Sequence, residues 1–205
     1  MFALTLGRHP DPFAVLGPHM SRHGRIVRAF LPGAFGVEAV APDGAPLGKL
    51  EDIGGDGLFG GLVAGDGPYR LRATWADAVS LAEDPYSYWP LLSDEDLRLI
   101  AAGEHPALPA VLGAHCLTLS GVPGVRFAVW APNARRVSVI GHFNGWDPRR
   151  NPMRLRHSAG VWEIFMPRLA AGERYKFALL GPDGATLPDK CDPFARATEA
   201  PPATA

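Results

Sequence analysis

The sequence contains little cysteine, no long apolar run and no excess of charge of either sign. Two of its 205 residues are cysteines, Cys116 and Cys191, which are too few for a disulfide framework and lie outside any Cys-x-x-Cys pattern. Reduced thiols and a cytoplasmic location are therefore expected. No segment approaches about 18 consecutive apolar residues, and the N-terminus lacks a basic segment followed by an apolar core. Neither a membrane span nor a secretory signal is predicted.

The balance of charge excludes two classes of partner. The chain carries 20 Lys and Arg against 21 Asp and Glu, a formal net charge of −1, and its basic residues form no stripe. Binding to a phosphate backbone or to an acidic membrane needs concentrated positive charge. We therefore expect neither nucleic acid nor a membrane surface to be a partner.

Glycine and proline are abundant and mark many turns. The 24 glycines and 21 prolines are scattered rather than clustered, which is typical of short strands joined by tight turns. Val125, Phe127 and Val129 are separated by single residues and are expected to face a core, and residues 161–166 and 175–180 show the same alternation. Short alternating segments of this kind indicate β-strands.

A faint internal duplication organises the chain. Four segments of the first half return in the second half: 16–19 with 112–115, 27–40 with 127–140, 57–73 with 160–178, and 83–88 with 191–196. One copy occupies roughly 9–90 and the other roughly 112–196. We predict an all-β protein of two tandem immunoglobulin-like β-sandwich domains joined by a short helical segment.

The helical segment is SDEDLRLIAAG, in which Ser93 is the predicted N-cap and Gly103 the stop. Its apolar residues could cover one end of either sandwich: Leu97, Ile100 and Ala101. The predicted domains are residues 1–104 and 105–198, and residues 199–205 are predicted to begin a linker.

No motif predicts a catalytic residue, a metal or an organic cofactor. The segment GDGLFG at 55–60 has the spacing of a dinucleotide fingerprint, but the glycine-rich residues after it cannot form the required helix. His19 and His23 are better interpreted as loop histidines than as metal ligands, because glycines and a proline bound the stretch. Asp11, Asp84 and Asp192 each precede a proline, where capping of the local turn explains them.

Trp146, in the turn FNGWDP, is the candidate binding residue. A pyranose ring has an apolar face and a polar rim, so a sugar site pairs an aromatic side chain with hydrogen-bonding groups. Trp146 could stack on such a ring, with Asn144 and Asp147 near its hydroxyls and Lys176 as a donor if the two segments are neighbours. Alternatively Trp146 packs against its own sandwich or a further domain, which the usual burial of aromatic residues favours.

Residues 127–154, FAVWAPNARRVSVIGHFNGWDPRRNPMR, resemble the glycogen (1,4-α-glucan) branching enzymes of the α-amylase superfamily. Residues 108–184 are similar to their family 48 carbohydrate-binding module. Further segments resemble the extra N-terminal domain of many bacterial members: 9–19, 27–34, 69–75 and 82–97. The resemblance implies glucan-binding roles for Trp146 and Lys176. Two departures are Thr186 and Leu187 where a second aromatic often stands, and His142 in place of an acidic residue.

The resemblance also implies what the chain does. Branching enzymes react in a (β/α)8 barrel of about 250 residues, which this sequence lacks, so we expect a fragment without catalytic residues that is inactive alone. The implied function is to bind and position α-1,4-glucan for transfer to 6-hydroxyls in glycogen biosynthesis. The implied partners are glycogen, malto-oligosaccharides and the barrel. The alternatives are a stand-alone glucan-targeting module, or docking domains for the barrel with no sugar affinity.

Overall fold

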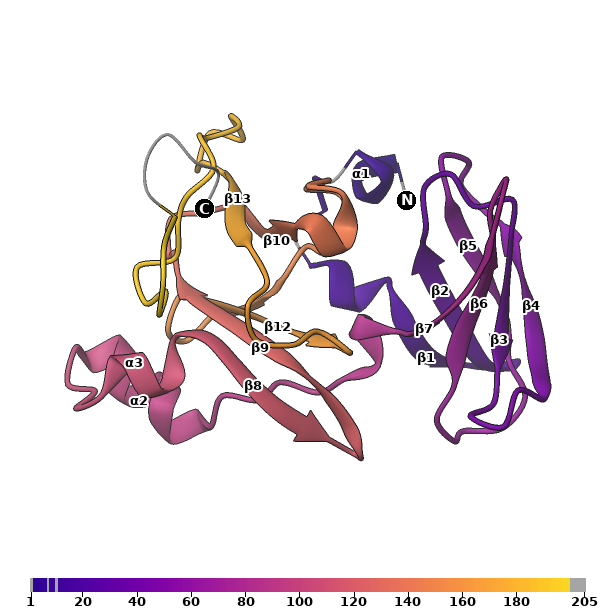
Figure 1. Ribbon diagram of the computed structural model, residues 1–205, viewed down its shortest axis with the longest axis horizontal. Coiled ribbons are helices and arrows are strands. Elements are labelled where there is room, and N and C mark those ends of the chain that lie inside the picture. Colours follow the sequence, from indigo (N-terminus) through magenta and orange to yellow (C-terminus); the bar gives the residue numbers. More distant parts are fainter. Residues whose placement is uncertain (1, 7, 10, 200–205) are drawn as a thin grey trace. The chain divides into compact units, whose positions relative to one another are not determined.

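The computed structural model describes residues 2–6, 8, 9 and 11–199 and divides into two compact, β-rich units (Figure 1). The first unit holds Pro12–Tyr88 and the residues up to Arg8, and the second holds His9–Asp11 and the chain from Trp89 onward. This division lies upstream of the predicted domain boundary after residue 104. All but the first residue of the predicted linker lie outside the described residues.

The first unit is a seven-stranded sheet folded into two layers. Its elements are α1 (Phe2–Thr5), η1 (Pro12–Ala14), β1 (Gly17–Ser21), β2 (Gly24–Phe30), β3 (Gly36–Val40), β4 (Pro46–Asp52), β5 (Leu58–Leu62), β6 (Arg70–Thr74), β7 (Val79–Glu83) and η2 (Pro85–Ser87). The strand order is β1-β2-β5-β4-β3-β6-β7. Strand β4 serves both layers, because its last residues, Glu51 and Asp52, pair with β5 while its earlier residues pair with β3.

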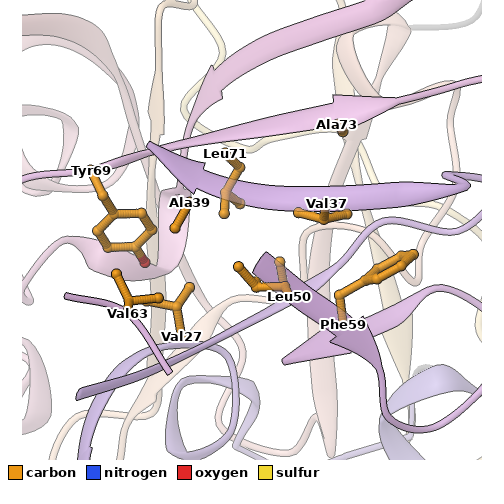
Figure 2. Close-up of a cluster of buried hydrophobic side chains, with 10 residues drawn as sticks. Val27, Val37, Ala39, Leu50, Phe59, Val63, Tyr69, Leu71 and Ala73 are labelled. Atoms are coloured by element: carbon orange, nitrogen blue, oxygen red, sulfur yellow. The ribbon is translucent and has the colours of Figure 1, made fainter. Parts of the chain in front are cut away.

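The core of this unit lies between the two layers. Figure 2 shows side chains from β2, β4 and β5 facing side chains from β3 and β6. The buried set comprises Val27, Ala29, Val37, Ala39, Leu50, Phe59, Val63, Tyr69, Leu71 and Ala73. Alternation along each strand sends these apolar side chains inward, as expected for a sandwich.

The second unit contains a four-stranded sheet, a strand pair and two helices. Its elements are α2 (Asp94–Ala102), α3 (Leu108–Val111), β8 (Gly113–Leu119), β9 (Val122–Trp130), β10 (Arg136–Gly141), η3 (His142–Asn144), β11 (Arg154–Arg156), β12 (Val161–Pro167) and β13 (Tyr175–Leu180). The sheet order is β11-β12-β9-β8, and β10 pairs with β13. Isolated bridges join Ser138 of β10 to Pro152, and Phe177 of β13 to Lys190.

The two units share one strand order, which confirms the predicted tandem sandwiches. Strands β8, β9, β12 and β11 follow each other as β1, β2, β5 and β4 do, and the pair β10-β13 matches β3-β6. The segment from Pro152 to Arg156 changes layers as β4 does, since Pro152 bridges to β10 and Arg154–Arg156 pairs with β12.

A tyrosine–aspartate hydrogen bond also recurs. The Tyr69 hydroxyl donates to Asp84 Oδ2 at 2.5 Å, and the Tyr175 hydroxyl donates to Asp192 Oδ2 at 2.5 Å. Each aspartate is almost completely buried and also accepts a backbone N–H two residues later at 2.9 Å. These contacts explain two of the Asp-Pro pairs in the sequence as turn-capping carboxylates.

Histidines recur as well, and one prediction about them was wrong. His19 lies in β1 rather than in a loop, and its Nε2 is 3.0 Å from the Leu16 carbonyl oxygen. His115, at the equivalent position of β8, makes the same contact with Leu112 at 2.9 Å. Among the described residues no group of three or more His, Cys, Asp or Glu side chains is arranged to hold a metal ion.

Helix α2 covers the second sandwich. Ser93 caps it by accepting the Asp96 N–H at 3.1 Å, and Gly103 ends it in the left-handed conformation with φ of 72°. Leu97 packs in a buried cluster with Ala128 of β9 and Val161 of β12. The central strands β9 and β12 are therefore buried on both faces, which the alternation of β9 alone does not indicate.

We expect Leu97→Ala to lower the free energy of unfolding by roughly 2 to 5 kcal/mol, because it leaves a cavity beneath α2. Urea denaturation of the whole chain measures this. Arg98→Ala, on the exposed side of the same helix, is the matched control and should change little. Equal midpoints for the two variants would show that α2 does not stabilise the sandwich.

Stability should also depend on the protonation of Asp84. Burial raises the pKa of this carboxyl from 3.8 to about 6, even though hydrogen bonds from Tyr69 and the Tyr86 N–H act in the opposite direction. Between these values the folded state binds more protons than the unfolded chain, so the free energy of unfolding falls as the pH rises from about 4 to about 6. Asp84→Asn should remove about 3 kcal/mol of this pH dependence. Urea melts at pH 4 to 7 provide the measurement, and parallel curves for both proteins would contradict it.

Candidate functional site

The FNGW turn closes the end of β10 with an unusual backbone. Strand β10 ends at Gly141, η3 follows, and Gly145 and Trp146 are both left-handed, with φ of 65° and 59°. The Trp146 N–H donates to the Gly141 carbonyl at 2.9 Å, which brings the chain back to the strand end. A bulky residue in this conformation costs about 1–2 kcal/mol that glycine avoids.

Asn144 builds this turn from inside. Its Oδ1 accepts the Gly141 N–H at 3.0 Å, and its Nδ2 donates to the Val139 carbonyl at 2.9 Å and to Asn151 Oδ1 at 2.8 Å. The side chain is buried, with 5% of the residue exposed. The expectation that Asn144 contacts sugar hydroxyls is therefore corrected: its amide is committed to the turn and positions Trp146 instead.

Trp146 itself is half-buried at the surface of the turn. The exposed His142 ring meets its indole edge to face, with ring centroids 5.4 Å apart and an interplanar angle of 80°. The sequence left two alternatives open for this tryptophan: stacking on a sugar ring, or packing against its own sandwich or a further domain. The residue is neither fully buried nor fully exposed.

Asp147 is held by the arginine that follows it. Its carboxylate accepts the Arg149 N–H at 2.9 Å and pairs with the Arg149 guanidinium at 2.8 Å. Burial acts to raise the pKa of Asp147, but the hydrogen bonds and charge of Arg149, with the charge of Arg150, bring it below its ordinary value. The carboxylate is thus ionised near neutral pH and oriented beside the tryptophan turn.

Lys176 lies on the neighbouring strand. It sits opposite Ile140 in the β10-β13 pair, and Tyr175, the residue before it, sits opposite Gly141. Because Gly141 also accepts the Trp146 N–H, the two predicted segments meet at one end of this strand pair. Lys176 is half-buried and alternates with the buried Phe177, so its side chain lies on the opposite face of β13 from that ring.

Sequence reasoning missed two polar residues at this surface. His142 was treated only as a departure from the family pattern, and Arg149 was not considered, yet both are exposed at the turn. The sequence could have indicated both residues, because each lies within four positions of Trp146. The position of the absent second aromatic is held by Leu187, whose N–H donates to the Leu179 carbonyl at 3.0 Å beside β13.

Comparison with known families assigns both sandwiches. Residues 111–195 match the family described as Carbohydrate-binding module 48 (Isoamylase N-terminal domain). The second sandwich is therefore a carbohydrate-binding module of family 48. Residues 1–86 match the family described as alpha-1,4-glucan branching enzyme GlgB, N-terminal domain. Taken together, the chain belongs to the 1,4-α-glucan branching enzymes and corresponds to their N-terminal part.

Full-length relatives agree with this assignment. The chain is 56% identical over its whole length to 1,4-alpha-glucan branching enzyme GlgB 2 of Rhizobium johnstonii, of which it covers 28%. It is 54% identical over 99% of its length to 1,4-alpha-glucan branching enzyme GlgB of Burkholderia vietnamiensis, again covering 28%. The chain thus spans little more than a quarter of these relatives.

Solved structures give a weaker likeness. Apo pullulanase from Klebsiella pneumoniae is 18% identical, with 79% of this chain and 20% of that chain covered at a TM-score of 0.30. Pullulanase from Anoxybacillus sp. LM18-11 complexed with maltotriose is 14% identical, with 84% of this chain and 24% of that chain covered at a TM-score of 0.34.

Within the part of this chain that the structure describes, no helix is long and apolar enough to cross a membrane.

The geometry of the turn makes a prediction for Asn144. Asn144→Ala leaves three hydrogen-bonding groups of the turn without their partner, so we expect the free energy of unfolding to fall by about 3 kcal/mol. Urea denaturation measures the change, with the exposed neighbour replaced in His142→Ala as the control. If both variants unfold at the same urea concentration, the amide does not hold the turn.

Proposed function

We propose that the second sandwich binds α-1,4-glucan at the end of β10-β13, and that the chain positions long glucans for the branching reaction of its family. The pyranose ring stacks on Trp146, and Lys176 donates to its hydroxyls. Asp147 and Arg149 form the polar rim, while Asn144 holds the tryptophan in place. No catalytic role is assigned to the residues that the structure describes.

The left-handed backbone of Trp146 carries this proposal. Glycine or asparagine would adopt this conformation at lower cost, so an indole at this position is explained best by a use for its ring. Its partial exposure leaves a face for a ligand, and aromatic faces beside hydrogen-bonding groups suit the CH face of a sugar.

The surrounding charges also suit a neutral, polyhydroxylated ligand. The charge of the Asp147 carboxylate is compensated by the Arg149 guanidinium at 2.8 Å and by that of Arg150 at 3.9 Å, and the group offers both donors and acceptors. Lys176 adds a donor from the adjacent strand.

We further propose a reducing cytoplasmic location, in keeping with the free, exposed thiols of Cys116 and Cys191.

Isothermal titration calorimetry of the whole chain with maltoheptaose tests the site. Trp146→Ala should weaken binding by at least about tenfold, because the stacking platform is lost. Lys176→Ala should weaken it by up to about tenfold through loss of one hydrogen bond. Trp130→Ala is the matched control, since Trp130 is an exposed tryptophan of the same sandwich, and it should leave affinity unchanged.

Two outcomes would overturn the proposal. Absence of binding by the unmodified chain would leave a docking role for the domains, without sugar affinity. Binding that survives Trp146→Ala but is lost in Trp130→Ala would move the sugar site to the end of β9.

A further inference from the structure

The second unit contains a cavity of about 530 Å³ that the proposed sugar site does not use. One wall is formed by β8 and β9, including Cys116, Val125 and Phe127. Tyr175 and the loop before it also line the cavity, as do residues of the segment from Cys191 to Glu199. The cavity therefore lies within one sandwich and at the strand edge that β8 provides.

The duplicated fold identifies the residue of the first unit that corresponds to Val125. In the second unit Cys116 of β8 pairs with Val125 of β9, and in the first unit Met20 of β1 pairs with Arg25 of β2. Val125 therefore holds in the second sandwich the position that Arg25 holds in the first. Tyr175 corresponds in the same way to Tyr69, since each donates to the buried aspartate of its own unit.

Arg25 fills this position in the first unit with a guanidinium group. Its Cζ atom lies 4.8 Å from the centroid of the Tyr69 ring, a cation–π contact. Its Nη1 donates to the Gly67 carbonyl at 2.7 Å and, over a longer distance of 3.4 Å, to the Gly65 carbonyl. A tyrosine face and the carbonyls of the loop between β5 and β6 thus form a guanidinium site that the chain occupies itself.

In the second unit Tyr175 and the loop between β12 and β13 line the cavity, and Val125 stands where the first unit has its arginine. Tyr175 is fixed by its bond to Asp192 and by an edge contact with Phe127 at 4.7 Å, and the loop between β12 and β13 again lies beside it. Val125 is too short to reach across, which leaves the cavity between these groups. Its charged lining is slightly acidic, with three carboxylates (Glu173, Asp192 and Glu199) against two guanidinium groups (Arg174 and Arg196).

We propose that this cavity binds a guanidinium group, such as an arginine side chain, on the face of Tyr175. The backbone carbonyls of the loop before Tyr175 accept its hydrogen bonds, as Gly65 and Gly67 do for Arg25 in the first unit. The site is separate from the sugar site, because Trp146 and Lys176 do not line the cavity.

Titration of the whole chain followed by methyl NMR tests this site directly. The Val125 methyl signals should shift saturably with agmatine and with a glycine-flanked arginine peptide. The same peptide with citrulline, which has the same shape and no charge, should bind at least about tenfold more weakly. Binding of the peptide alone indicates a protein segment as the source of the group, and binding of agmatine alone indicates a small molecule. Equal binding of the citrulline peptide, or no shift with either arginine ligand, would overturn the proposal.

Two substitutions test whether the two units are equivalent at this position. Val125→Arg should abolish agmatine binding and raise the melting temperature, whereas the uncharged Val125→Met should not raise it as much. Should Val125→Arg fail to fold, Arg25→Val provides an independent test in the first unit. That variant should melt at a lower temperature, and agmatine should restore its melting temperature more than it shifts that of the unmodified chain. Equal shifts for both proteins would count against a guanidinium site at this position of the fold.

Discussion

A hydrogen bond from a tyrosine hydroxyl to a buried aspartate closes each sandwich of this chain. Tyr69 with Asp84, and Tyr175 with Asp192, connect a core strand to the segment that leaves the sandwich. Each carboxylate also caps the turn after it, so one side chain fixes both the packing and the path of the chain. Because an unpartnered buried carboxylate is costly, the bond and the turn are retained together or lost together.

Much of this fold could be predicted from sequence, because the duplication repeats whole strand-and-turn units. The alternation of Phe127 with its neighbours predicts the strand, and the segments before Asp84 and Asp192 align without knowledge of their contacts. Burial on the second face could not be predicted. Ala128 and Arg126 face the helical segment, and alternation within one strand carries no information on what covers its outer side.

The candidate site shows the same limit. The turn and its tryptophan are visible in the sequence, and so is the neighbouring lysine strand. Asn144 was expected to contact the ligand because its amide suits hydroxyl groups, but the same amide suits the backbone of a tight turn, and only geometry distinguishes the two uses. The residue type does not predict the left-handed conformation of Trp146 either, since glycine or asparagine is the usual residue in that conformation.

Helix α2 has a consequence for how such modules are exchanged between proteins during evolution. Its Leu97 and the neighbouring Leu92 cover Ala128 and Val161, so the second sandwich is complete only together with the segment that precedes it in the chain. A recombination event that joined another protein directly to β8 would transfer the sheet without its cover. The unit that can move intact between genes therefore begins near Trp89, well before the first strand of the module itself.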